Sequence, residues 1–241
     1  MTKINGRTNM IVYGKNVAKE ILKNNKKIEK IILYENFDDK EILNLIENKK
    51  IYPQKLGKKE FSKFDKYSSQ GIILYIEDFK YSDIEDFTNN LSSVVVILDH
   101  LEDPHNLGAI IRTAEAAGVD GIIIPKDRSV DINSTVMKTS AGALENMKIA
   151  KVTNLNQTIQ QLKNKGYWIV GTDMENSMDY RQIDYTGKIA LVIGNEGTGM
   201  SRQVRESCDF IAQIPMYGKI NSLNASVAAG IMIYEAIRIK K

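Results

Sequence analysis

Three segments of the sequence combine glycines, amides and charged side chains in a pattern that suggests binding chemistry. The first, residues 98–114, reads as the end of a strand, a polar turn and a helix that starts near Gly108. Arg112 would then lie in the first turns of that helix, where the helix dipole favours anions. An external anion such as an RNA phosphate would explain an arginine there. The alternative is a surface arginine paired with Glu115 or Asp103.

The second segment, residues 193–201, places glycines at positions 194, 197 and 199 around the carboxylate of Glu196. Glycines let a backbone approach a ligand closely. The spacing does not match a phosphate-binding loop, and the carboxylate would repel a polyphosphate. The segment therefore favours a ligand with a cationic centre, and a simple glycine-rich turn is the alternative.

The third segment, residues 214–230, is a turn rich in amides and hydroxyls that opens a long C-terminal helix. Ser222 and Asn224 stand next to the expected helix start, where backbone N–H groups are unpaired. Helix capping would account for one such residue but not for the whole polar set. The turn is therefore a second candidate for ligand contact.

These three segments fit one α/β architecture. Between residues 93 and 241, strand-like and helix-like stretches alternate, which predicts a largely parallel sheet with helices on both faces. The strands are expected at 94–98, 121–124, 149–152, 167–171, 189–193 and 210–214, and the helices at 108–117, 134–145, 156–165, 201–206 and 222–239. Ligands of such sheets bind beyond the carboxyl ends of the strands, and each of the three segments follows an expected strand.

The N-terminal part differs in charge and pattern. Residues 1–66 carry 16 Lys and Arg against 9 Asp and Glu, whereas residues 67–90 carry 1 against 5. A basic region of this kind is typical of a nucleic-acid binder, and a solvated lysine-rich surface is the alternative. A helical pattern within residues 13–22, an expected helix at 39–48 and expected strands at 28–34 and 72–76 predict a small α/β domain. We therefore expect a domain at 1–78, a linker or short helix and loop at 79–92, and a second domain at 93–241.

Several function classes are disfavoured. Two histidines and one cysteine offer no metal-ligand spacing, so no metal is expected. A nucleophile elbow and a dinucleotide fingerprint are both absent. The longest apolar run, residues 94–98, is far too short to span a bilayer, and the N-terminus lacks a signal-peptide pattern. Cys208 has no cysteine partner and is expected to be a small buried side chain, so the composition fits a cytoplasmic protein.

In order and spacing, the three segments resemble the three motifs of the SpoU family of RNA ribose methyltransferases. The resemblance extends through residues 125–129, 151–155 and 171–173, and residues 13–17 and 70–72 resemble the family's ribosomal-protein-like RNA-binding domain. The resemblance covers nearly the whole chain. Within the family, the sequence most resembles the subgroup that methylates a guanosine of 23S rRNA. Two positions depart from that subgroup: Asn195 replaces a small residue, and Ser69 replaces a common histidine.

The resemblance implies more than the pattern shows. It implies a trefoil-knotted parallel-sheet SPOUT methyltransferase domain, a homodimer with active sites near the subunit interface, and S-adenosylmethionine as cofactor. Residues at cofactor-binding positions are Thr172, Gly194, Ile214, Met216 and Leu223, with largely backbone contacts. Residues at catalytic or substrate-positioning positions are Asn106, Arg112, Glu196, Ser222 and Asn224.

The expected activity is therefore 2′-O-methylation of a ribose, with a guanosine of 23S rRNA as the expected target. Arg112 is a poor general base because its free pKa exceeds about 12, so phosphate binding and alkoxide stabilisation are its expected roles, with a phosphate-relayed proton transfer as the alternative. Two alternatives stay open. One is a tRNA ribose methyltransferase of the same family, and the other is a non-catalytic RNA-binding or ribosome-assembly factor.

Overall fold

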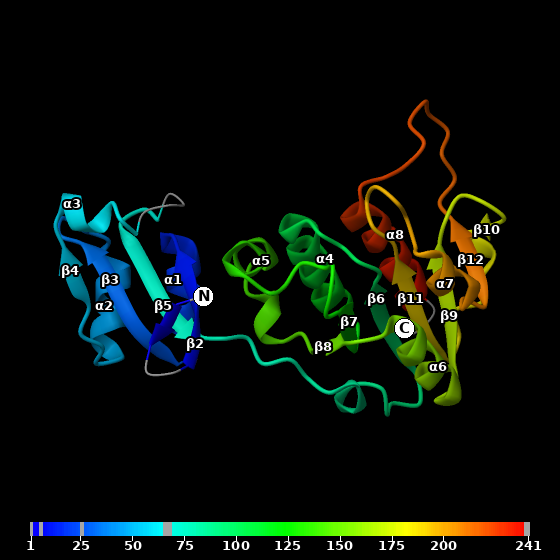
Figure 1. The fold of residues 1–241 in the computed structure, drawn as a ribbon, viewed down its shortest axis with the longest axis horizontal. Helices are drawn as coiled ribbons and strands as arrows, with labels where there is room; N and C mark the ends of the chain where they lie inside the picture. Colours follow the sequence, from blue (N-terminus) through cyan, green and yellow to red (C-terminus); the bar gives the residue numbers. More distant parts are fainter. Residues whose placement is uncertain (1, 5–6, 25–26, 65–68, 239–241) are drawn as a thin grey trace. The chain divides into compact units, whose positions relative to one another are not determined.

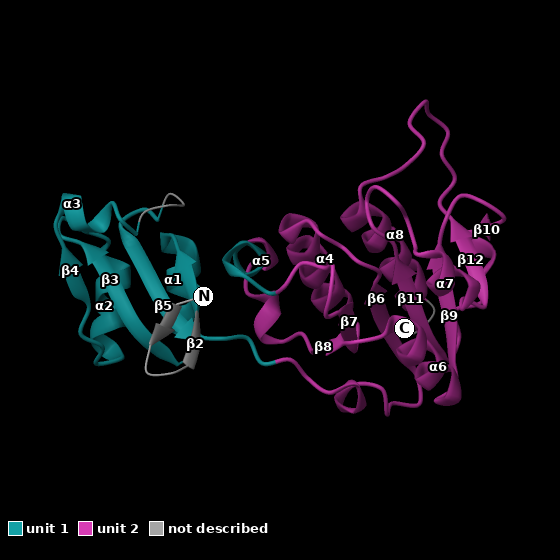
Figure 2. Ribbon diagram, viewed as in Figure 1, with its two compact units in different colours: residues 1–80, 132–138 teal, residues 81–131, 139–241 magenta. Residues whose placement is uncertain are grey.

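The computed structural model describes residues 2–4, 7–24, 27–64 and 69–238. Figure 1 labels the helices and strands, and Figure 2 shows the two compact units into which the chain divides. The first unit comprises residues 1–80 and 132–138, and the second comprises residues 81–131 and 139–241. Among the described residues, no helix is long and apolar enough to cross a membrane.

The first unit is a small α/β fold built on a five-stranded sheet. The strand order is β1-β2-β5-β3-β4, and only β3 and β4 pair in parallel. Its elements are β1 (Thr2–Ile4), β2 (Arg7–Tyr13), α1 (Lys15–Lys23), β3 (Ile28–Tyr34), α2 (Lys40–Asn48), β4 (Gln54–Leu56), α3 (Lys58–Phe61) and β5 (Ile72–Glu77). The buried side chains of α1 recur at positions 17, 18, 21 and 22, which is the helical spacing that the sequence predicts. The sequence pattern missed β1, β2, β4 and α3.

The second unit contains a seven-stranded sheet in which every neighbouring pair is parallel. The strand order is β10-β12-β9-β11-β6-β7-β8. The strands are β6 (Ser93–Leu98), β7 (Gly121–Pro125), β8 (Ile149–Val152), β9 (Tyr167–Thr172), β10 (Met178–Asp179), β11 (Lys188–Ile193) and β12 (Phe210–Gln213). The parallel α/β prediction is confirmed, and all six predicted strands are present. The two-residue strand β10 was not predicted.

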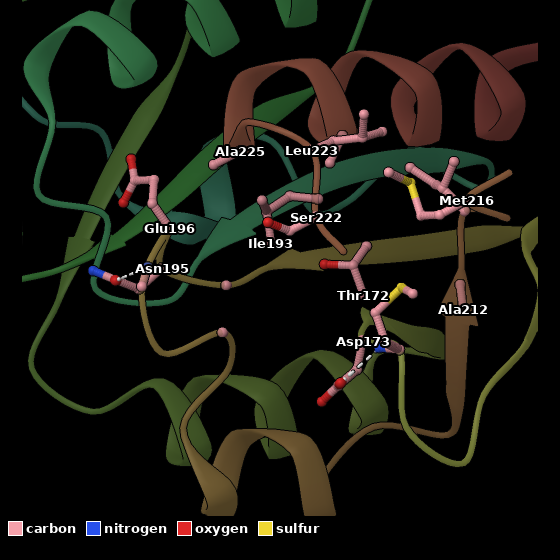
Figure 3. Close-up of a pocket in the computed structure, with 16 residues that line it drawn as sticks. Thr172, Asp173, Ile193, Asn195, Glu196, Ala212, Met216, Ser222, Leu223 and Ala225 are labelled. Atoms are coloured by element: carbon pink, nitrogen blue, oxygen red, sulfur yellow. Dashed lines mark hydrogen bonds between the residues drawn. The ribbon is translucent and has the colours of Figure 1, made fainter. Parts of the chain in front are cut away.

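Helices cover both faces of this sheet. They are α4 (Pro104–Ala117), α6 (Leu155–Asn164), α7 (Arg202–Glu206) and α8 (Ala225–Arg238), with 3-10 turns at Ile84–Asp86, Ala143–Glu145 and Tyr180–Gln182. Most of α5 (Ser134–Ser140) belongs to the first unit. On one face, Ile159 of α6 and Val204 of α7 belong to the same buried cluster as Val192 of β11. On the other face, α8 packs against both β11 and α4. Figure 3 shows α8 on the opposite side of the strands from the α6 and α7 helices.

The start of α4 differs from the sequence prediction, which placed it near Gly108. The helix begins at Pro104, because the Asp103 carboxylate caps it by accepting from the His105 backbone N–H at 2.8 Å. Proline is well suited to the first position of a helix, where its missing N–H costs nothing. Arg112 therefore lies in the third turn of α4, and the dipole argument for an external anion was wrong.

Two other helix boundaries also differ. The helix predicted at 134–145 stops at Ser140, because Ala141 and Gly142 adopt left-handed backbone conformations with φ of 49° and 88°. The helix predicted from residue 222 begins at Ala225 instead. The Asn224 side chain accepts from the Ser226 backbone N–H at 2.9 Å, so it caps this helix. Residue 239, the predicted end of that helix, lies outside the described residues.

Candidate functional site

A pocket lies beyond the carboxyl ends of β9, β11 and β12, where α8 begins. Its volume is about 270 Å³, near the lower end of the range of small-molecule sites. Parallel strands carry their connecting loops at the same edge of a sheet, so residues distant in sequence converge there. The structure brings together all five residues expected to bind cofactor, and Glu196 and Ser222 line the same pocket. Those five are Thr172, Gly194, Ile214, Met216 and Leu223.

The pocket has one apolar side and one polar side. Figure 3 shows Ile193, Met216 and Leu223 at the pocket, where they offer an apolar surface. The polar contribution comes from backbone groups and from Thr172, Asp173, Asn195, Glu196 and Ser222. No lysine or arginine belongs to this lining, whereas two carboxylates do. The pocket therefore suits a ligand with a flat apolar part and a cationic centre better than a polyphosphate.

Gly194 allows the β11–α7 loop to fold back onto the end of β11. A Cβ atom at this position would lie 2.4 Å from the carbonyl carbon of Gly199 and 2.5 Å from the backbone nitrogen of Met200. The loop is closed by two backbone hydrogen bonds between Asn195 and Gly199, each of 2.9 Å. Any side chain at Gly194 would push this turn away from the strand, so the pocket wall depends on the glycine.

A chain of hydrogen bonds joins the three sequence segments next to the pocket. The Asn106 amide donates to Glu196 Oε1 at 2.6 Å, and the Asn224 amide donates to Asn106 Oδ1 at 3.0 Å. Asn106 is buried, with 6% of its surface exposed, whereas Glu196 and Asn224 are exposed. The N-terminal turn of α4 thus holds both the Glu196 loop and the start of α8. Four of the five candidate catalytic residues, Asn106, Glu196, Ser222 and Asn224, lie in this arrangement.

Arg112 is the exception. It is exposed on α4 and does not line the pocket. Within the described part of the chain, its side chain has neither a hydrogen bond nor an ion pair, so the alternative of pairing with Glu115 or Asp103 was wrong. The guanidinium is therefore available to an anion that the single chain does not supply.

Asp99 was missed by sequence reasoning, although it contributes to the site's architecture. Its side chain is 1% exposed, contacts His100 Nδ1, and accepts from the Ser201 backbone N–H at 2.6 Å. The Asn195 amide reinforces the same junction by donating to the His100 carbonyl at 2.7 Å. These bonds fix the β6–α4 loop against the β11–α7 loop. The only sequence signal was an aspartate directly after a buried strand.

Asp173 was quoted in the sequence resemblance but not assigned to the site. Its carboxylate accepts from the Met174 backbone N–H at 2.6 Å and from Arg205 Nε at 2.8 Å. Burial alone would raise the pKa of Asp173, but hydrogen bonds from Glu175 N–H, Arg205 and Met174 N–H outweigh it, and the pKa lies below its usual value. The ionised carboxylate thus pins the loop after β9 to α7.

Comparisons with known proteins agree with this geometry. The SpoU rRNA Methylase family matches residues 93–234, and the RNA 2′-O ribose methyltransferase substrate binding family matches residues 11–82. A protein of Staphylococcus saprophyticus named as a TrmH family tRNA/rRNA methyltransferase is 46% identical over 237 residues, which cover 95% of each chain. A Staphylococcus haemolyticus protein of the same name is 43% identical, also with 95% of each chain covered.

Solved structures give the same result. An AdoMet-bound rRNA methyltransferase from Sinorhizobium meliloti is 28% identical, with a TM-score of 0.78, and the match covers 96% of this chain and 87% of that one. The TrmH/SpoU tRNA modifying enzyme of A. aeolicus is 36% identical, with a TM-score of 0.56 and coverage of 64% and 78%. The chain therefore belongs to the SpoU family of RNA methyltransferases, whose methyl donor is S-adenosylmethionine.

Proposed function

We propose that the protein methylates the 2′-hydroxyl of a guanosine ribose in 23S rRNA. The observation that carries this proposal is the hydrogen-bonded Asn106–Glu196–Asn224 chain beside a pocket suited to S-adenosylmethionine. The ribose target is supported by the substrate-binding family that residues 11–82 match. The rRNA target is supported by the Sinorhizobium meliloti relative and by the sequence resemblance to the 23S rRNA subgroup.

The pocket fits S-adenosylmethionine in chemistry. The apolar side formed by Ile214, Met216 and Leu223 suits an adenine ring, and Gly194 leaves its backbone open to contact. Glu196 provides a negative charge for a cationic ligand, and no basic side chain opposes it within the lining. When bound, the cofactor supplies an electrophilic methyl group on a sulfonium.

The chain's own residues would position the ribose and stabilise the charge that develops on its 2′-oxygen. Asn106 holds the Glu196 carboxylate at the pocket, and Asn224 and Ser222 offer amide and hydroxyl groups to the ribose. Holding two reactants in the correct geometry supplies roughly 7–11 kcal/mol of a barrier, so positioning carries much of the rate. Arg112 binds the adjacent phosphate and stabilises the developing alkoxide, because a guanidinium stays protonated at neutral pH.

Arg112 lies outside the pocket lining of its own chain, so we propose that a homodimer completes the site. In this arrangement, the partner's Arg112 serves each pocket. The exposed apolar side chains of Val227 and Tyr234 on α8 provide surface for such an interface, with 50% and 56% of their areas exposed. Mixing an Arg112→Ala subunit with a Gly194→Ala subunit tests this arrangement. At S-adenosylmethionine concentrations too low to fill the Gly194→Ala pocket, mixed dimers should regain activity that neither variant shows alone. No recovery in exchanged dimers under these conditions would contradict the shared site.

The domain roles are also proposals. We assign RNA binding to residues 1–78, a linker to residues 79–92 and methyl transfer to residues 93–241. The trefoil knot and the cytoplasmic location stay predictions from the sequence.

A tRNA ribose is the second candidate substrate, because the A. aeolicus relative is a tRNA modifying enzyme. A non-catalytic RNA-binding or ribosome-assembly role is disfavoured, because the Asn106–Glu196–Asn224 chain is intact. Mapping 2′-O-methyl groups in RNA from cells with and without the gene distinguishes the three. Loss of one guanosine methyl group in 23S rRNA is the expected result. Loss only in tRNA would favour the second candidate, and an unchanged map would favour the third.

A further inference from the structure

The loop after β7, residues 126–131, carries two basic side chains that the proposed reaction does not use. Lys126 and Arg128 are both exposed. Within the described part of the chain, neither side chain has a hydrogen bond or an ion pair. Asp127 lies between them and is also exposed, so its negative charge offsets part of the positive charge of the loop. Any role of the two basic side chains is therefore short-range contact rather than long-range attraction.

Backbone contacts fix this loop beside the first functional segment. The Ser129 hydroxyl donates to the Leu101 carbonyl at 3.1 Å, and the Val130 N–H donates to the same carbonyl at 2.8 Å. Leu101 belongs to the β6–α4 loop, which leads to Asn106. The loop after β7 is therefore held on the same edge of the sheet as the pocket.

Sheet order gives the spacing along that edge. β7 neighbours β6, and β6 neighbours β11, whose end carries Glu196. Neighbouring strands lie about 4.8 Å apart, so the ends of β7 and β11 are separated by about 10 Å. An RNA strand whose ribose reaches the pocket can place a neighbouring phosphate over the loop after β7.

The backbone of Arg128 supports a role for its side chain. Its φ is 51°, in the left-handed region that favours glycine. A glycine would adopt this turn without strain, yet the position carries a large cation that has no hydrogen bond or ion pair within the described chain. Residues held in such conformations are concentrated at functional sites.

The path of the chain adds a further observation. The second unit begins at Tyr81, whose hydroxyl donates to Asp131 Oδ1 at 2.7 Å. Asp131 is the last residue of the same loop. This hydrogen bond holds the first residue of the second unit against the end of the loop.

We propose that Lys126 and Arg128 bind backbone phosphates of the RNA next to the target nucleotide. This inference deepens the assigned RNA methyltransferase function and requires only an RNA substrate, whichever nucleotide is modified. Arg128 offers a planar fork of donors that matches phosphate oxygens, and Lys126 offers a point charge. Neither contact reads the base, so both act on affinity and register.

The test compares Arg128→Gly, the Lys126→Gln/Arg128→Gly double variant and a control. Arg128→Gly removes the guanidinium and also relieves the left-handed strain, so its thermal unfolding midpoint should not fall. Lys148→Gln is the control, because Lys148 is exposed at the amino end of β8, on the opposite edge of the sheet. Equilibrium binding of a 23S rRNA transcript and of a tRNA pool is measured from 0.05 to 0.3 M salt.

Each lost phosphate contact should lower the slope of log affinity against log salt by about 0.7 and weaken binding about fourfold at 0.15 M salt. The double variant should therefore lose about 16-fold in affinity for the RNA that the enzyme methylates, with S-adenosylmethionine affinity unchanged. An affinity and slope equal to those of Lys148→Gln would overturn the proposal. So would a loss of S-adenosylmethionine binding with RNA affinity intact. Methylation of an unexpected nucleotide would refute only the target assignment.

Discussion

Replacing Gly194 with alanine provides a direct test of how the pocket is built. The new Cβ atom would lie 2.4 Å from the carbonyl carbon of Gly199 and 2.5 Å from the backbone nitrogen of Met200, where ordinary contact begins at 3.4 Å. Both neighbours are backbone atoms, so no side-chain rotation relieves the overlap. The turn from Asn195 to Gly199 must therefore move by about 1 Å.

A movement of that size would break the two 2.9 Å hydrogen bonds that close the turn between Asn195 and Gly199. Each is worth about 0.5–1.5 kcal/mol net, so the loss is about 1–3 kcal/mol. Because the turn forms one wall of the pocket, most of this loss should reach cofactor binding. The Kd for S-adenosylmethionine should rise by about 5- to 150-fold.

Gly197→Ala is the matched control in the same turn. Its Cβ atom would meet only Asn195 Oδ1, at an ordinary contact distance of 3.5 Å. Isothermal titration of both variants with S-adenosylmethionine measures the difference, and a melting curve without ligand checks the fold. Equal affinities for Gly194→Ala, Gly197→Ala and the unmodified protein would refute the geometric reasoning.

Three further predictions concern other parts of the site. Asn106→Ala should lower kcat about 10²-fold with little change in cofactor affinity, because the residue orients Glu196 but does not line the pocket. A fall in S-adenosylmethionine affinity as large as the fall in kcat would contradict this role. Asp173→Asn should lower the free energy of unfolding near neutral pH by about 1–2 kcal/mol. The depressed pKa of Asp173 gives stability that is present above its unfolded pKa and lost as pH falls through the folded value, so the difference in urea unfolding should shrink below pH 4. Burial raises the pKa of Cys208 to about 12, so at pH 8 iodoacetamide should react about 10³ times more slowly than with free cysteine, and a near-normal rate would contradict the burial.

The sequence pattern was sufficient to predict the parallel sheet, whereas the pocket residues came from the family resemblance. Each strand of the second unit is a short apolar run, and a parallel sheet brings the loops at its carboxyl ends together. Thr172 at the end of β9 and Ile214 after β12 were assigned to the cofactor site from the family resemblance, and the structure places both in one pocket lining. The two-residue strand β10 lacked any such run and depends on its pairing with β12, so no local pattern predicted it.

The contacts between loops could not be predicted in the same way. Asn106 and Glu196 are 90 residues apart, and their hydrogen bond depends on the pairing of Leu98 with Ile193 at the ends of β6 and β11. The buried Asp99 depends on the same register. The start of α4 was missed for a different reason: the apolar period begins after Pro104, whereas the cap that starts the helix precedes it.

The central claim is that the pocket delivers a methyl group to a ribose oxygen of RNA. The decisive measurement is incubation of the protein with S-adenosylmethionine labelled in the methyl group and a 23S rRNA transcript, followed by complete alkaline hydrolysis. A 2′-O-methyl group blocks alkaline cleavage at its own linkage, so we expect the label in an alkali-resistant dinucleotide that contains guanosine. Label in an ordinary mononucleotide would show methylation of a base and would contradict the account.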